Sequence, residues 1–437
     1  MPLVFTGAVT LAGAVQATGS GYIPPPPPPA SSYYIGTLTG LIADSGNNTA
    51  ADNSGNSYVL GAGKVVKLTN TGSISWQKSL DASTADSWGA VDSLDNIHVT
   101  YGNTVVKYNS AGTMQWQRSL LTVSWQAVTV DSSSNVYLIG YSSGTVDIII
   151  AKYNASGNIQ WQRRLATPSN YYDLGYGIAV DSSGNVYVGG GDQTNKGYIA
   201  KYNASGTIQW QKSITNEFSL NFGYVTGRVG GVSVDSSGNV YVAVELLYTV
   251  SSTAAMDIHL VKFDSSGTAL WQRRLASPNN GNEYFASMTT DSAGNSYITS
   301  RSNRNSYAIT MFKYNSSGTI QWQREIVNPG TGYGIGGISV FSTKMFVVGT
   351  TTISGSSIGY FAALPVDGTL TGTYSLSTVT GGSVTYQVNT TVTDSAGAMT
   401  IATSSLTAST SSLTEQAGSL SETTPSLTIT TVTVGLV

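Results

Sequence analysis

Residues 177–214 read GIAVDSSGNVYVGGGDQTNKGYIAKYNASGTIQWQKSI, and this stretch decides the fold. Four short runs in it alternate β-branched or aromatic residues with small or polar ones, which is typical of β-strands. The runs are separated by turn sequences such as DSSGN and NASG, whose Asp, Asn, Ser and Gly residues favour a reversal of the chain. The stretch is therefore predicted to form a four-stranded antiparallel meander.

The two signatures of this stretch recur along the chain. The first places Asn four residues after an Asp, at Asp52, Asp92, Asp131, Asp181, Asp235 and Asp291. The second is a Trp-Gln pair after an Asn/Ser/Gly turn, at Trp76, Trp116, Trp161, Trp210, Trp271 and Trp322. Residues 338–374 carry a seventh, eroded copy without the Trp. Seven copies with this spacing predict an all-β fold, a seven-bladed β-propeller over residues 36–376.

Composition narrows the classes of function. The chain has 20 basic and 23 acidic residues, so it has no basic excess for binding nucleic acid. It has no Cys, which excludes disulfides, thiolate metal sites and cysteine nucleophiles. No apolar run is long enough for a membrane-spanning helix. The two histidines, His98 and His259, have no partner His and are interpreted as packing or hydrogen-bonding residues.

The repeat is similar to known families. Its Asp-turn half, DSSGNVYV with the glycines that follow, resembles the bacterial β-propeller repeat of secreted and surface proteins. Its second half, KYNASGTIQWQ, resembles the Trp-docking strand of quinoprotein-type propellers. The resemblance implies a propeller fold over about three quarters of the chain. It implies no single function, because propellers serve as enzymes, lectins and scaffolds alike.

The repeated residues are interpreted as parts of the scaffold. Six equivalent tryptophans indicate packing between blades rather than ligand stacking. The Asp turns look like calcium loops but lack the later bidentate Glu, so each Asp is expected to bond its own turn. Calcium binding at these turns is the alternative. We expect no catalytic residue, metal site or cofactor.

A ligand is expected on one face of the propeller only. The segments that join second to third strands, and one blade to the next, vary in length and composition and share a face. Variable loops on a rigid scaffold are where binding residues concentrate. Their aromatic, amide and charged side chains suit a sugar or a protein epitope, and polar loops without a ligand are the alternative. The candidates are Tyr171, Tyr172, Asp173, Phe218, Phe222, Tyr224, Arg228, Glu283, Tyr284, Arg301, Arg304 and Tyr307.

The two ends of the chain differ from the repeats. Residues 1–22 form a small apolar segment that we interpret as an anchor, with a signal peptide as the alternative. Residues 23–35 contain six consecutive prolines and predict a stiff polyproline spacer. Residues 377–437 have no Lys or Arg, are rich in Ser and Thr, and predict a β-strand tail. Because this tail is too poor in apolar residues for a core of its own, it should pack on the propeller or on neighbouring copies.

This layout resembles the modular organisation of bacteriophage fibre or appendage proteins. It predicts a non-enzymatic virion structural protein that displays the propeller for attachment to a host-surface glycan or protein. The N-terminal segment would contact other virion proteins in an oligomeric assembly, with no nucleic-acid partner and no membrane span. A secreted or cell-surface bacterial adhesin or lectin is the alternative. A quinoprotein-like or polysaccharide-degrading enzyme is the third hypothesis, which no catalytic cluster in the sequence supports.

Overall fold

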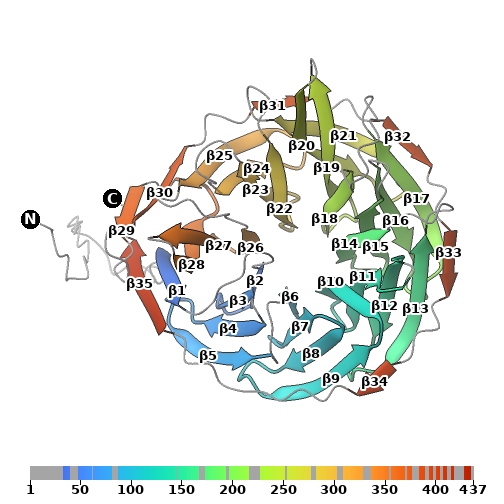
Figure 1. The fold of residues 1–437 in the computed structure, drawn as a ribbon, viewed down its shortest axis with the longest axis horizontal. Helices are drawn as coiled ribbons and strands as arrows, with labels where there is room; N and C mark the ends of the chain where they lie inside the picture. The colour runs from blue at the N-terminus through green and yellow to red at the C-terminus, as the bar shows by residue number, and fades with distance from the viewer. Residues whose placement is uncertain are drawn as a thin grey trace, which may run out of the picture.

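The computed structural model describes residues 33–39, 48–61, 63–80, 87–144, 146–166, 173–192, 196–215, 227–250, 253–276, 282–302, 309–327, 336–353 and 356–369, together with seven short strands between 372 and 434. In these residues the strands form seven antiparallel sheets around a central axis (Figure 1). The predicted all-β, seven-bladed propeller is confirmed. Within the same residues, no helix is long and apolar enough to cross a membrane.

In the first four blades, the strands run from the axis outwards in chain order. Blade one consists of β2 (Asn48–Ala51), β3 (Ser57–Gly61), β4 (Lys64–Leu68) and β5 (Ile74–Ser79). Blade two consists of β6 (Ser87–Val91), β7 (Ile97–Tyr101), β8 (Thr104–Tyr108) and β9 (Met114–Leu120). Blade three consists of β10 (Val123–Val130), β11 (Val136–Ser142), β12 (Ile148–Tyr153) and β13 (Ile159–Ala166). Blade four consists of β14 (Leu174–Val180), β15 (Val186–Gly191), β16 (Gly197–Tyr202) and β17 (Ile208–Thr215).

The last three blades complete the ring. Blade five consists of β18 (Arg228–Val234), β19 (Val240–Val250), β20 (Thr253–Phe263) and β21 (Ala269–Ala276). Blade six consists of β22 (Glu283–Thr290), β23 (Ser296–Ser302), β24 (Ile309–Tyr314) and β25 (Ile320–Val327). Blade seven consists of β26 (Gly337–Phe341), β27 (Lys344–Ile353), β28 (Ser356–Pro365) and, as its fourth strand, β1 (Tyr33–Thr39).

The fourth strand of blade seven comes from the N-terminal end of the chain. β1 pairs antiparallel with β28, from Tyr34 opposite Ala363 to Leu38 opposite Gly359. Residues 33–35 therefore belong to the propeller, and their assignment to the polyproline spacer was wrong. The side chains of Tyr34 and Ile35 are buried between strands of the ring, which is why this segment is held as a strand rather than as part of an exposed spacer.

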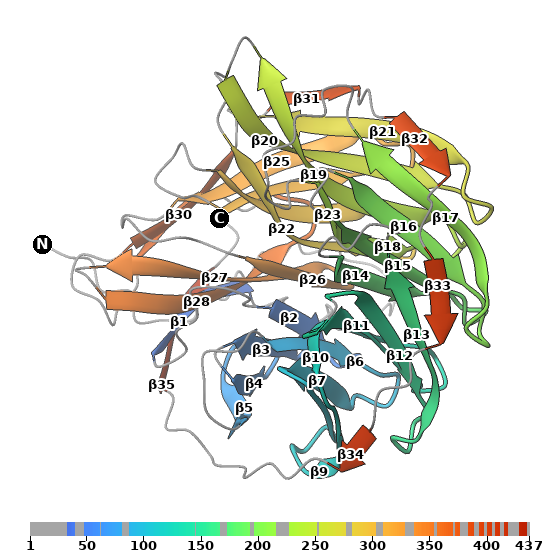
Figure 2. The same cartoon turned by 45° about the vertical axis from the view of Figure 1, so that its right-hand side comes forward.

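The Ser/Thr-rich tail lies along the outer edge of six blades. The tail strands are β30 (Ser383–Val388), β31 (Thr393–Ala396), β32 (Thr400–Thr403), β33 (Thr407–Thr410), β34 (Glu415–Ala417) and β35 (Thr428–Val434). β29 (Gly372–Ser375) lies just before the tail and pairs with β30. From β30 to β34 the tail strands pair in turn with the fourth strands of blades six, five, four, three and two, and β35 pairs with β1. Figures 1 and 2 show them around the outside of the ring. The expectation that the tail packs on the propeller is confirmed.

Each Asp of the first signature organises the turn between the first and second strands of its blade. In blade three, Asp131 Oδ1 accepts the backbone N–H groups of Ser133 and Asn135, both at 2.9 Å. Its Oδ2 accepts the Asn135 amide at 2.8 Å and the Tyr137 hydroxyl at 2.9 Å. These contacts explain why Asp, Asn and an aromatic residue recur together at fixed spacing, and they use both carboxylate oxygens for the turn.

The repeated tryptophans join neighbouring blades. Trp116 donates its indole N–H to the carbonyl oxygen of Ala155 in the next blade at 3.0 Å, and Arg118 Nε donates to Gly157 in the same turn at 2.7 Å. The prediction that these residues pack between blades is confirmed by equivalent contacts from all six tryptophans. Their burial is less complete than expected, because only Trp322 is fully buried and the other five are half-buried.

Candidate functional site

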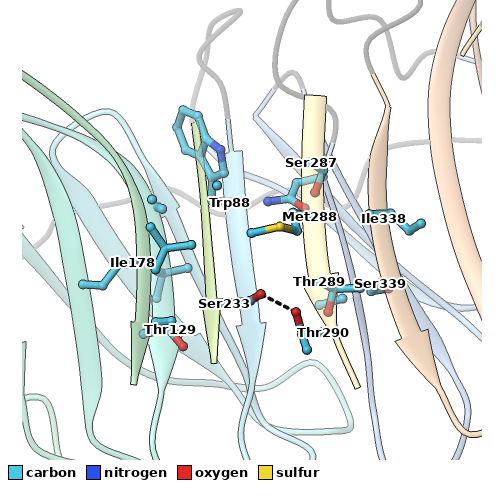
Figure 3. Close-up of a pocket in the computed structure, with 18 of the residues that line it drawn as sticks. Trp88, Thr129, Ile178, Ser233, Ser287, Met288, Thr289, Thr290, Ile338 and Ser339 are labelled. Carbon is cyan, nitrogen blue, oxygen red and sulfur yellow. Dashed lines mark hydrogen bonds between the residues drawn. The ribbon is translucent and has the colours of Figure 1, made fainter. Parts of the chain in front are cut away.

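The first strands of the seven blades surround a cavity of about 480 Å³ on the propeller axis, here called the channel cavity. All seven first strands, β2, β6, β10, β14, β18, β22 and β26, contribute to its lining. The described side chains that line it are small, aliphatic, aromatic, hydroxyl or amide groups, and none of them carries a charge. Figure 3 shows Trp88, Ile178, Met288 and Ile338 among them, with the hydrogen bond between the hydroxyls of Ser233 and Thr290.

Four first strands carry a β-bulge beside this cavity. The register shifts occur at Gln126, Tyr176, Gly230 and Ala286, in blades three to six. Each of these residues stands five positions before the Asp of its turn. A bulge changes the direction in which neighbouring side chains point, and bulges are common beside binding sites. Tyr176, Gly230 and Ala286 all line the cavity.

Three aromatic side chains from alternate blades line the channel cavity. They are Trp88 of blade two, Tyr176 of blade four and Phe285 of blade six, and each remains partly exposed. Sequence analysis missed all three, because it placed ligand residues on the variable loops, whereas these lie in the first strands of their blades. The position of Tyr176, five residues before Asp181, was the available signal, but a bulge at that position cannot be seen without the pairing register.

An ion pair between the partly exposed Arg228 and the buried Glu245 contacts the Tyr176 ring and the Phe285 backbone. Arg228 Nε lies 2.5 Å from Glu245 Oε2, and the Arg228 guanidinium lies 5.0 Å from the centre of the Tyr176 ring. Glu245 Oε1 also accepts the backbone N–H of Phe285 at 2.6 Å. The attraction of Glu245, opposed by burial, raises the pKa of Arg228, while burial raises the pKa of Tyr176. Arg228 is therefore a cation held in place by Glu245.

Two further ion pairs stabilise the loop face, defined as the face that carries the loops between second and third strands. Arg164 Nε contacts Asp147 Oδ2 at 2.6 Å in blade three, and Arg274 contacts Asp257 Oδ2 at 2.6 Å in blade five. Burial raises the pKa of Asp257, an effect that Arg274 opposes. These pairs join the third and fourth strands within one blade, so they stiffen the ends of the strands that support the loops.

The predicted ligand-binding residues occupy different environments. Tyr284 and Arg301 lie together, with the guanidinium 4.6 Å from the ring centre. Arg228 forms the ion pair with Glu245, and Glu283 is fully buried and accepts a hydrogen bond from Ser300 at 2.9 Å. Asp173 is also buried, with 1% of its surface exposed. The others, Tyr171, Tyr172, Phe218, Phe222, Tyr224, Arg304 and Tyr307, lie outside the described residues.

Both histidines are buried in the scaffold. His98 takes the place that Tyr occupies in other blades, and its Nε2 lies 3.2 Å from Asp92 Oδ2, which also pairs with Lys107. Burial is the main cause of the lowered pKa of His98. His259 lies beside Val244 on the adjacent strand, and burial, with a smaller contribution from Arg274, lowers its pKa to about 3.

The sequence profiles of two families match the chain. Residues 195–426 match a family described as outer membrane protein assembly factor BamB, and residues 160–190 match one described as beta-propeller repeat. The first match spans more than half of the chain. The chain belongs to this BamB-type propeller family. The resemblance to bacterial propeller repeats is thereby confirmed, and no curated protein gave a significant match over the sequence.

Solved structures similar to this BamB-type propeller share the fold at low identity. A protein of unknown function from Bacteroides caccae is 13% identical, with 64% of this chain and 93% of that chain covered and a TM-score of 0.41. A chain of the mitotic checkpoint complex is 11% identical, with coverages of 78% and 98% and a TM-score of 0.49. A europium-containing methanol dehydrogenase is 10% identical, with coverages of 75% and 93% and a TM-score of 0.41. At such identities the likeness concerns the fold alone.

Proposed function

We propose that the protein is a non-enzymatic virion structural protein of the tail-fibre or appendage type, which displays its propeller for attachment to a host surface. The observation that carries this proposal is the position of β1. This strand is paired on both sides, with β28 and with β35, and the predicted spacer and anchor precede it directly in the chain. A force applied through the N-terminal segment would therefore be shared by the hydrogen bonds of β1 with β28 and those of β1 with β35.

The closed ring supports a role as a rigid display platform. The tail strands pair with the outer edges of six blades. Because these edges are covered, their backbone N–H and C=O groups are not available for pairing with other chains. The loop face also carries two long hairpins, β19 with β20 and β27 with β28. Their strands are 10 or 11 residues long, whereas most blade strands have five to eight. Such projections on a stiff ring suit recognition of a surface.

The chemistry of the channel cavity supports a non-enzymatic role. Acid–base catalysis and nucleophilic catalysis need an ionisable or activated side chain within reach of the substrate. The described lining has no carboxylate, imidazole or ammonium group, and its one phenol, that of Tyr176, has a pKa that burial raises, so it stays protonated at neutral pH. Binding without turnover is the activity that this lining favours.

The proposal is tested by locating the chain in fractions of a producing culture. We expect quantitative mass spectrometry to find it in gradient-purified particles at a constant ratio to the other virion proteins. Its presence only in the cell-envelope or secreted fraction would overturn the proposal in favour of the surface adhesin or lectin. A variant that lacks residues 1–30 should be absent from particles, whereas one that lacks only residues 418–437 should be incorporated.

A further inference from the structure

The channel cavity brings aromatic and hydroxyl groups together on the propeller axis. Trp88, Tyr176 and Phe285 come from three different blades, are partly exposed and line the same cavity. The hydroxyl and amide groups of Asn48, Thr129 and other residues line the rest of it. The cavity's volume of about 480 Å³ lies within the range of about 300 to 1,000 Å³ that is typical of pockets for small ligands, and its exposed lining is more polar than apolar.

Two of the three aromatic side chains, those of Tyr176 and Phe285, are held in position before any ligand arrives. The guanidinium of Arg228 lies against the Tyr176 ring at 5.0 Å and is itself fixed by Glu245. Phe285 packs into space left by two glycines, because a Cβ on Gly230 or Gly231 would come within 2.5 Å or 2.4 Å of its ring. The backbone N–H of Phe285 is bonded to Glu245 as well. Such preorganisation lowers the entropy that binding costs.

The charge of the lining restricts the ligand. A buried anion or cation needs an opposite charge or a set of strong hydrogen bonds, and the described lining offers no charged side chain. Arg228, which lies against the Tyr176 ring, does not line the cavity and already pairs with Glu245 at 2.5 Å. The ligand should therefore be neutral, with one apolar face for the aromatic rings and several hydroxyls for the Ser, Thr and Asn groups.

We propose that the channel cavity binds the end of a neutral saccharide chain, with a sugar ring stacked on Trp88. This inference rests on the proposed attachment function, because it names the class of receptor. The aliphatic face of a pyranose ring provides the apolar surface, and its hydroxyls replace water around the polar lining. The site differs from the predicted loop residues in being on the axis and formed by the first strands.

The test is calorimetric titration of the full chain with neutral hexasaccharides, namely maltohexaose, cellohexaose, mannohexaose and N-acetylchitohexaose, and with anionic sialyllactose. At least one neutral sugar should bind and sialyllactose should not. Trp88→Ala should weaken that binding about tenfold or more, which corresponds to about 1.4 kcal/mol. Leu94→Ala is the matched control, because Leu94 is 72% exposed in the Asp turn of the same blade and does not line the cavity.

Tryptophan fluorescence provides a second measurement of sugar binding that does not depend on the stability of the variant. Sugar binding should shift the emission of the parent, and that shift should be smaller in Trp88→Ala with an unchanged circular dichroism spectrum. No binding of any neutral sugar, binding of sialyllactose alone, or equal binding by parent and Trp88→Ala would overturn the saccharide site. The virion proposal fails separately, through the absence of the chain from purified particles.

Discussion

The indole nitrogen of Trp210 donates a hydrogen bond of 3.2 Å to the carbonyl oxygen of Ser265, across the boundary between blades four and five. The same carbonyl accepts a bond from Lys201 Nζ at 2.9 Å. The indole also lies against Gly267, where a Cβ would be 2.9 Å from the ring. Six of the seven blades hold the next blade through such a Trp, and these contacts help to join the separate sheets into one body.

Replacing Trp210 with Ala should destabilise the propeller by about 2–4 kcal/mol, somewhat less than a fully buried Trp would lose, because the indole is half-buried. Chemical denaturation followed by circular dichroism measures the change. Trp210→Phe keeps most of the apolar contact and loses the hydrogen bond, so it should cost about 1 kcal/mol. An unchanged denaturation midpoint for Trp210→Ala would contradict this account of the blade contacts.

Replacing Ser134 with Gly should stabilise the protein by about 0.5–1 kcal/mol. Ser134 has a φ of 59° in the Asp turn of blade three, whereas Gly184 and Gly238 occupy the same position with φ of 77° and 78°. A side chain in this left-handed region is strained, and glycine is not. The thermal midpoint measures the gain. Ser133→Gly, one residue earlier and without a positive φ, is the control and should give no gain.

Stability should fall as the solution is acidified from about pH 6.5 towards pH 3. His259 has a pKa of about 3 in the folded protein, and burial lowers that of His98 as well, whereas unfolded histidine titrates near about 6.5. Between these values the unfolded state binds more protons, so the free energy of unfolding decreases as the pH falls. Denaturation at a series of pH values measures this slope.

The variant His98→Tyr distinguishes the contribution of His98 to this pH dependence from that of His259. Tyr stands at this position in other blades, as Tyr137 and Tyr187 do, where its hydroxyl donates to the Asp of the turn. The substitution should keep the bond to Asp92 and remove one titrating group, so the stability at neutral pH is retained and the acid slope decreases. A slope equal to that of the parent would show that His98 does not contribute to it.

Truncation at the N-terminal end should separate the predicted spacer from the closing strand. Removal of residues 1–30 should leave the thermal midpoint close to that of the full chain, because β1 begins at Tyr33. Removal of residues 1–40 deletes β1 and exposes the buried surface that Tyr34 and Ile35 cover. That variant should unfold at a clearly lower temperature. Equal midpoints for the two truncations would show that β1 is not needed to close the ring.

Removal of residues 377–437 should make the propeller associate with itself. The deletion uncovers the outer edges of six blades, and uncovered sheet edges pair with other chains. Light scattering should show oligomers that grow with concentration. Removal of residues 418–437 uncovers only β1, so it should have a much smaller effect. If the protein without residues 377–437 stayed monomeric and as stable as the full chain, the tail strands would not be needed to protect the blade edges.

Local sequence was enough to predict the blades because each one is built from local contacts. The spacing Asp131, Asn135 and Tyr137 encodes a complete hydrogen-bonded turn within seven residues, and the same spacing recurs in every clear copy. The Trp positions indicate how one blade packs on the next, because a residue repeated once per blade contacts the equivalent turn of the following blade each time. Strand order within the first six blades, turn positions and the number of blades therefore followed from the sequence.

Contacts between distant parts of the chain were decided only by the tertiary structure. Nothing local in residues 33–39 says that they complete the blade formed by residues 337–365, and Thr-rich segments carry too little pattern to specify which edge they join. The channel cavity depends in the same way on all seven first strands. Trp88, Tyr176 and Phe285 are ordinary strand residues in the sequence, and they line one cavity because ring closure brings their strands to the same axis.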